Sequence, residues 1–181
     1  MVDSKNSINL LLSKVYFAPL TLEDIEEVRL WRNNPKINNF IINKNHITAA
    51  QQLKWFDNLG ENQKYYFIAK VDQEKLGLFY ATQVDLGQKS CEPNGFMGNP
   101  TYFKSPIAGL IIVEFFKKLF LELDFETLNG KVVRDNVSFI QLHALLGAEI
   151  SEDESKNLSY ITLDKARFNE TITKLLNCDK N

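Results

Sequence analysis

The first block of the chain with a clear periodicity follows Thr21 and indicates an amphipathic helix. Apolar residues recur there at helical spacing, at Ile25, Val28 and Trp31, which places them on one face. Thr21 is followed three residues later by a carboxylate, a variant of the capping box that opens helices. Because a residue before proline avoids the helical conformation, the pattern predicts that this helix ends before Pro35.

Further helices are predicted downstream. One should begin at Thr48 and stop at Gly60, with an apolar stripe at Leu53, Phe56 and Leu59. Residues 107–123 are apolar over much of a helical circumference, so this helix should lie largely buried against a sheet. Shorter helical patterns are found at 137–146, before Gly147, and at 168–176.

Strands are indicated by β-branched and aromatic runs between turn signals. Two such runs, 65–71 and 76–84, are separated by a polar turn, which is the pattern of an antiparallel hairpin. The segment 86–94 contains Gly, Ser and Pro and is expected to be a loop. The other predicted strands cover residues 16–20, 95–99, 128–134 and 159–163.

The resulting order, β-α-α-β-β-β-α-β-α-β, predicts an α/β fold, an α+β mixed sheet with helices and a strand–helix–strand crossover in its last half. The chain has 181 residues, of which 44% are hydrophobic and 24% charged, a composition typical of a globular domain. We therefore expect residues 1–181 to form a single domain with one core.

The charge balance and the rare residues exclude several classes of protein. Lysine and arginine total 21 against 23 aspartates and glutamates, so no basic field is available for nucleic-acid phosphates, and no nucleic-acid partner is expected. The sequence shows neither a secretory signal nor an apolar run of about 20 residues, so we predict a cytoplasmic protein that binds no membrane. Two cysteines without CxxC spacing and two histidines predict no metal site.

The segment with the most chemical information is GFMGNPTYFKSPIAGLII, residues 95–112. It predicts a strand, a turn and the start of the long helix. A helix N-terminus offers backbone N–H groups and the positive end of the helix dipole, which suit a bound phosphate. Residues 130–149 predict a second strand, which ends in an Arg-Asp-Asn turn and leads into a helix.

In these two segments the chain resembles the GCN5-related N-acetyltransferase (GNAT) superfamily, which transfers acetyl groups from acetyl-CoA to primary amines. The matched motif residues are Gly95, Asn99, Pro100 and Tyr102 in the first segment and Asn136, Ile140, Leu142 and Gly147 in the second. The opening LTLEDIEEVRLWRNNPKI and the later QLKWF are similar to the branch of ribosomal-protein and nucleotide-sugar N-acetyltransferases, such as the flagellin-sugar enzyme of the pseudaminic acid pathway. The resemblance covers about residues 16–165 and implies the GNAT acyl-CoA N-acyltransferase fold.

The resemblance also implies acetyl-CoA as co-substrate, with no metal. Phe103 takes the place of the family's Arg or Gln, Pro106 replaces the first glycine of the pyrophosphate turn, and Ala108 keeps its last small position. Proline lacks an N–H group and suits the first helical turn. The implied cofactor contacts are Phe96, Met97, Gly98, Phe103, Lys104, Ser105, Pro106, Ile107, Ala108, Gly109, Asn136 and Phe139.

For catalysis, the resemblance places His143 where the family has the tyrosine that protonates the departing thiolate, close to two helical turns from Asn136. The alternatives are a buried structural histidine and a helix-capping asparagine. The histidine that the family has before L-x-W-F is Gln52 here, and residues 31–33 could instead supply core, salt bridge and turn. Acceptor contacts are expected from Trp31, Arg32, Asn33, His46 and Gln52.

We therefore expect an acetyl-CoA-dependent N-acetyltransferase that acts on the primary amine of a small, nucleotide-linked amino sugar. Backbone N–H groups of residues 95–99 would polarise the thioester carbonyl. Two alternatives stay open: a protein or ribosomal-protein N-acetyltransferase, and a degenerate, non-catalytic CoA-binding module. The expected partner is a small-molecule amine acceptor, and a homodimer is an open option.

Overall fold

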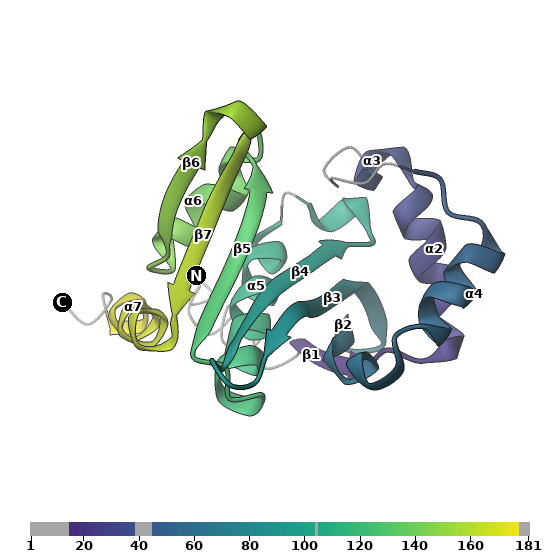
Figure 1. The fold of residues 1–181 in the computed structure, drawn as a ribbon, viewed down its shortest axis with the longest axis horizontal. Coiled ribbons are helices and arrows are strands. Elements are labelled where there is room, and N and C mark those ends of the chain that lie inside the picture. The colour runs from purple at the N-terminus through teal and green to yellow at the C-terminus, as the bar shows by residue number, and fades with distance from the viewer. Residues whose placement is uncertain (1–14, 39–44, 104, 178–181) are drawn as a thin grey trace, which may run out of the picture. The chain divides into compact units, whose positions relative to one another are not determined.

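A computed structural model describes residues 15–38, 45–103 and 105–177, which form two compact units (Figure 1). The first unit holds the described residues up to Tyr80 together with Asn94–Lys117. The second holds Ala81–Pro93 and the described residues from Lys118 onward. Strands β3 and β4 contribute residues to both units.

The strands of the first unit follow each other in the order β1-β2-β3-β4. β1 pairs antiparallel with β2, and β2 forms an antiparallel hairpin with β3, as the sequence predicts. The hairpin turn is shorter than expected, because strand β3 already begins at Glu74, directly after Asp72 and Gln73. These strands span Val15–Pro19 (β1), Tyr66–Val71 (β2), Glu74–Asp85 (β3) and Ser90–Met97 (β4).

The helices of the first unit begin at the predicted caps. The backbone N–H and the hydroxyl of Thr21 both donate to Asp24 Oδ2, at 2.9 and 2.8 Å, and Thr48 Oγ1 accepts from the Gln51 N–H. A 3-10 turn after Thr21 leads into α2, and α2 and α4 lie side by side (Figure 1). The helices span Ile25–Asn33 (α2), Pro35–Asn38 (α3), Ala49–Asp57 (α4) and Pro106–Lys117 (α5).

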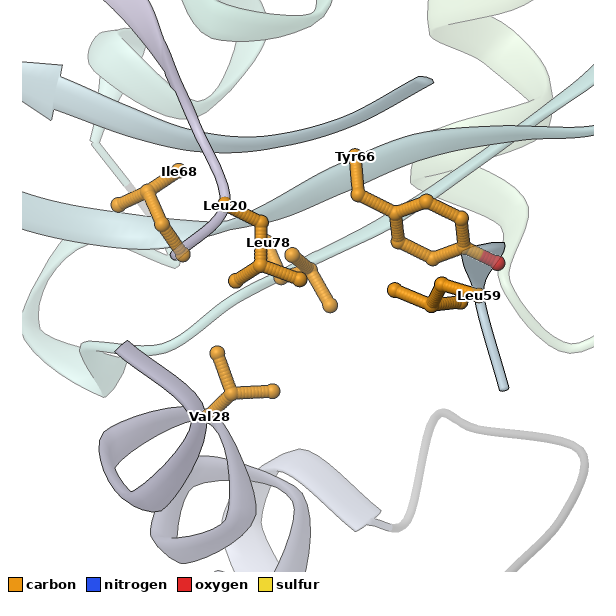
Figure 2. Packing of buried hydrophobic residues seen from close by; sticks show 6 residues of the cluster. All are labelled: Leu20, Val28, Leu59, Tyr66, Ile68 and Leu78. Atoms are coloured by element: carbon orange, nitrogen blue, oxygen red, sulfur yellow. The ribbon is translucent and has the colours of Figure 1, made fainter. Parts of the chain in front are cut away.

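Both faces of the sheet in this unit are buried. On one face Ile68 of β2 and Leu78 of β3 pack with Val28 of α2, in a cluster completed by Leu20, Leu59 and Tyr66 (Figure 2). On the other face Phe17 and Phe79 contact Phe115 of α5, with ring centroids 5.4 and 5.5 Å apart. Successive strand residues point to opposite faces, so two covered faces require the continuous apolar runs seen in β2 and β3.

One predicted stripe is wrong in detail. Leu53 of α4 is 45% exposed, whereas its neighbour Gln52 is buried, and Trp55 and Phe56 are the side chains that pack on the cluster. Phe56 and Leu59 therefore face the core as predicted, and only Leu53 does not, because Gln52 and Trp55 take the remaining inward positions. Gly60 has a φ of +50°, in agreement with a stop signal after this helix.

In the second unit the strand order is β4-β5-β7-β6. β4 pairs parallel with β5, and β7 pairs antiparallel with both β5 and β6, so β5 and β6 are parallel with β7 between them (Figure 1). The predicted crossover therefore runs from β5 through α6 to β6. The elements span Thr127–Val133 (β5), Val137–Leu145 (α6), Glu149–Asp153 (β6), Leu158–Asp164 (β7) and Lys165–Asn177 (α7).

One strand is additional to the prediction, and another begins earlier than predicted. β6 is an additional strand, because its sequence EISED holds one apolar residue and its charges suit an edge strand. β4 begins at Ser90, inside the expected loop, because the buried Cys91 pairs with Leu128 of β5. Pro93 has no N–H to donate and follows these pairs rather than interrupting them.

The predicted long helix is also divided. α5 ends at Lys117, and a π-helical segment, Lys118–Glu122, continues the chain. Among the described residues, no helix is both long and apolar enough to cross a membrane.

Candidate functional site

The turn between β4 and α5 is held by a series of hydrogen bonds. The Asn99 side chain accepts from the Thr101 N–H at 3.0 Å, and the Tyr102 carbonyl accepts from both the N–H and the hydroxyl of Ser105 at 3.0 Å. The Ser105 carbonyl then accepts from the Ala108 N–H at 3.2 Å. Pro106 is the first residue of α5, as its missing N–H requires.

Small residues keep the start of α5 accessible. A Cβ atom added at Gly109 would have no atom within 4 Å, and Ala108 is half-buried, whereas Ile107 points into the core. Phe103 and Met97 are half-buried at the two ends of the turn, and Lys104 lies outside the described residues. The first helical turn can therefore receive a group at its N-terminus without steric conflict from Gly109.

Two pairs of predicted site residues, distant in sequence, meet in the first unit. A Cβ atom at Gly98 would overlap the indole ring of Trp31, so the ring lies directly against the end of β4. The Arg32 guanidinium carbon lies 5.8 Å above the centre of the Phe96 ring. The last turn of α2 and the end of β4 thus form one surface.

Aromatic residues surround this surface. Tyr66 and Tyr80 stack with centroids 4.7 Å apart, and Trp55 meets Tyr66 edge-on at 5.6 Å. Burial raises the pKa of Tyr66 to about 12, so its phenol stays neutral at physiological pH. Burial also lowers the pKa of the Arg32 guanidinium, which remains charged because its ordinary value is 12.5. Arg32 is thus a half-buried cation held above the Phe96 ring.

A groove of about 430 Å³ adjoins Trp31 and Gly98 in the same unit. Lys75 at its rim pairs with Asp24 at 2.8 Å and with Glu27 at 3.1 Å. Burial would raise the pKa of Asp24, but the hydrogen bonds from Lys75 and Thr21 outweigh it and lower the pKa. The groove is lined by Glu27, Trp31, Gln73, Glu74, Lys75, Gly98, Asn99 and Pro100.

The other predicted acceptor residues lie apart from this surface or have internal partners. The Asn33 amide donates to the Ile47 carbonyl at 2.7 Å and accepts from the Ile47 N–H at 2.9 Å, which fastens the segment before α4 to α2. His46, which precedes Ile47 in the chain, is exposed, and Gln52 is buried in α4. Both polar groups of the Asn33 side-chain amide are therefore hydrogen-bonded to the backbone of Ile47.

In the second unit, His143 lies in the last turn of α6 and contacts Phe139, one turn earlier in the same helix. His143 is 3% exposed, its Nδ1 lies 2.8 Å from the Phe139 carbonyl, and the two rings are 4.1 Å apart. Because a carbonyl only accepts, Nδ1 carries a proton, and burial lowers the pKa of the imidazole. Asn136 occupies the N-cap position, yet its side chain makes no capping hydrogen bond.

Glu74 is a polar residue of this region that the sequence did not predict. Glu74 accepts hydrogen bonds from Asn99 and Tyr102, two residues of the matched motif. A single glutamate after a turn carries no sequence signal, so only the hairpin position of Glu74 reveals this contact. Among the described residues, no group of three His, Cys, Asp or Glu side chains could hold a metal ion.

The sequence has relatives among acetyltransferases. No model of a known protein family matches the chain. Two curated relatives, each called "Acetyltransferase PseH", come from Campylobacter jejuni serotypes O:2 and O:23/36. They are 29% and 28% identical over 151 residues, which is 83% of this chain and 92% of each relative.

Solved structures show the same fold. Apo FdhC, described as a nucleotide-linked sugar GNAT, matches with a TM-score of 0.75 and 23% identity, over 91% of this chain and 93% of FdhC. Spermidine N-acetyltransferase from Vibrio cholerae, in complex with CoA and spermine, matches with a TM-score of 0.74 and 14% identity, over 87% and 99%. In sequence this chain is similar to PseH acetyltransferases, and its fold is the one seen in GCN5-related N-acetyltransferases.

Proposed function

We propose that this enzyme transfers an acetyl group from acetyl-CoA to the primary amine of a small, nucleotide-linked amino sugar. The observation that carries the acceptor class is the match over 91% of the chain to FdhC, which is described as a nucleotide-linked sugar GNAT. The similarity to two PseH acetyltransferases over 83% of the chain supports acetyl transfer. The Arg32 cation above Phe96 is suited to phosphate or sugar oxygens of such an acceptor.

The co-substrate is proposed to bind at the turn 103–109 and the start of α5. This position is supported by the matched motif, by the Pro106 start of α5 and by the open space beside Gly109. Backbone N–H groups there suit a pyrophosphate, and those of residues 95–99 would polarise the thioester carbonyl. From the resemblance alone, Asn136 and Phe139 are proposed as further acetyl-CoA contacts.

The acceptor amine must be neutral to attack the carbonyl carbon, and its proton passes to water or a carboxylate afterwards. We propose His143 as the group that protonates the departing thiolate. Burial lowers the pKa of His143, so its donor form should be available only on the acidic side of neutrality. His143→Phe should reduce kcat with little change in acetyl-CoA affinity, whereas full kcat from pH 6 to 9 would show a structural histidine.

The central experiment combines calorimetry with an acceptor panel. Acetyl-CoA should bind, and mass spectrometry should detect acetylation of an amino-sugar nucleotide in preference to spermidine or a ribosomal-protein N-terminal peptide. Preference for the peptide would favour the protein acetyltransferase alternative. Binding without any acetylation would favour the non-catalytic CoA-binding module, and no heat at millimolar acetyl-CoA would refute the proposed function.

Two substitutions separate the two halves of the site. Arg32→Ala should raise the acceptor KM about tenfold and change the acetyl-CoA KM little, since one charge-assisted contact is lost. Arg167→Ala in the second unit, where Arg167 pairs with Glu149 on the surface, is the matched arginine control. Ala108→Leu should block acetyl-CoA binding by bulk, and unchanged affinity in a folded variant would remove the turn from the site.

A further inference from the structure

Glu74 connects the β2–β3 hairpin to the turn that follows β4. The Tyr102 hydroxyl donates to Glu74 Oε2 at 2.7 Å, and the Asn99 amide donates to Glu74 Oε1 at 3.2 Å. Both carboxylate oxygens are therefore used, each by a different residue of the turn. The hydrogen bond to Glu74 raises the pKa of the Tyr102 phenol, so this donor keeps its proton throughout the neutral range.

Tyr102 connects its hydrogen bond with Glu74 to the start of α5. Its carbonyl accepts from the N–H and the hydroxyl of Ser105, and the Ser105 carbonyl accepts from the Ala108 N–H. The side chain of Tyr102 is thus anchored at Glu74 while its backbone holds the residue before Pro106. A change at Glu74 can reach the first turn of α5 through two consecutive hydrogen-bonded residues.

The neighbouring charged residue, Lys75, has other partners than the turn that Glu74 contacts. Lys75, the next residue, pairs with Asp24 and Glu27 and belongs to the α2 side of the groove. Glu74 and Lys75 therefore face different partners from adjacent positions of one strand, as the alternation of a β-strand requires. Lys75 restrains α2, and Glu74 restrains the turn.

We propose that Glu74 is a positioning residue for acetyl-CoA, an inference that rests on the proposed function. It acts through Tyr102 and Asn99 by holding residues 99–103 and Ser105 so that the start of α5 presents its backbone N–H groups in the geometry the pyrophosphate needs. Preorganised donors bind more tightly than donors that must be ordered on binding, because the ordering entropy has already been lost. Glu74 is exposed, so the expected effect is moderate.

The sign of the effect distinguishes positioning from surface charge. Acetyl-CoA carries negative phosphates, and removal of a nearby carboxylate would by charge alone leave its binding unchanged or strengthen it. If Glu74 positions the turn, its removal weakens binding instead. The two explanations therefore predict opposite changes in the same measurement.

The test measures acetyl-CoA affinity by calorimetry and both KM values by steady-state kinetics. Glu74→Ala should weaken acetyl-CoA binding about five- to tenfold, with an unchanged acceptor KM. Tyr102→Phe removes only one of the two hydrogen bonds of Glu74 and should weaken binding in the same direction but no more than Glu74→Ala. The double variant should be no worse than Glu74→Ala, because that substitution already removes the contact with Tyr102. Glu74→Gln, which keeps an acceptor oxygen for Tyr102, should restore most of the affinity. Glu61→Ala, an exposed glutamate of the same unit, controls for charge.

Hydrogen exchange supplies a readout in the ligand-free protein. Amides of residues 101–103, 105, 107 and 108 should exchange about five times faster in Glu74→Ala than in the wild type or Glu61→Ala. Unchanged exchange, or acetyl-CoA affinity equal to or above that of the wild type, would overturn the positioning role while leaving the proposed function intact. A wild-type protein that does not bind acetyl-CoA would refute the proposed function and, with it, this role of Glu74.

Discussion

The two units of this enzyme bury their strands differently. In the first unit, β2 presents four consecutive buried residues, Tyr66 to Ala69, because helices cover both faces of its sheet. In the second unit, β7 alternates strictly, with Ser159, Ile161 and Leu163 buried and the residues between them exposed. The difference shows that β2 is covered on both faces whereas β7 keeps one face exposed, and it is the unit of β2 that carries the groove and the turn before α5.

The sharpest way to test this contrast is to remove one aromatic side chain from each unit. Phe79→Ala should lower the free energy of unfolding by about 3–5 kcal/mol, because Phe79 packs between Phe17 and Phe115. Tyr160→Ala, on the open face of β7, should cost less than about 1 kcal/mol. Urea denaturation measures both. Equal losses would show that the open face is covered in solution.

A smaller difference in the free energy of unfolding is expected when one glycine of each unit is replaced by alanine. Gly98→Ala forces a Cβ atom into the Trp31 ring and should cost about 2–3 kcal/mol, with loss of acceptor binding as Trp31 shifts. Gly130→Ala in β5 meets only Ile161 at an ordinary 3.9 Å and should stay within about 0.5 kcal/mol of the wild type. Thermal and urea unfolding compare them. A tolerated Gly98→Ala would contradict the close contact of β4 with Trp31.

Replacing one lysine in each unit compares the contributions of their ion pairs to stability. Lys75→Met leaves the buried Asp24 carboxylate without its cation and should cost about 1–2 kcal/mol near neutral pH. The pKa of Asp24 is lowered on folding, so this stability is present above its ordinary value of 3.8 and is lost as the pH falls through the folded pKa. Lys165→Met, which breaks exposed pairs with Asp124 and Glu126, should change stability less. A gap between Lys75→Met and the wild type that does not narrow as the pH falls below 3.8 would refute this account.

The smallest expected effect is the pH dependence contributed by His143. Its folded pKa lies below the ordinary 6.5, so the unfolded chain binds the proton more readily and stability rises with pH through this range. Unfolding curves from pH 7 to pH 5 should therefore show a loss of stability that is reduced in His143→Gln. Identical slopes in both proteins would show that the imidazole is not buried in its neutral form.

Local elements were largely predictable. The hairpin, the Thr48 cap, the Pro106 start of α5 and the stop at Gly147, whose φ is +94°, depend on neighbouring residues. The motif residues Asn99, Pro100 and Tyr102 were also found at the turn that the resemblance implies. The sequence could not predict β6, because its polar residues form a strand only when β7 offers an edge.

What the sequence determined by itself is therefore the set of local structures and the resemblance to the GNAT superfamily, since capping, turn chemistry and motif spacing act over a few residues. Tertiary structure decided which distant residues meet: Trp31 with Gly98, Arg32 with Phe96, and Glu74 with Tyr102. It also decided that β7 lies between β5 and β6. Such contacts depend on strand register and on packing across a sheet, where a shift of one residue moves every side chain to the other face.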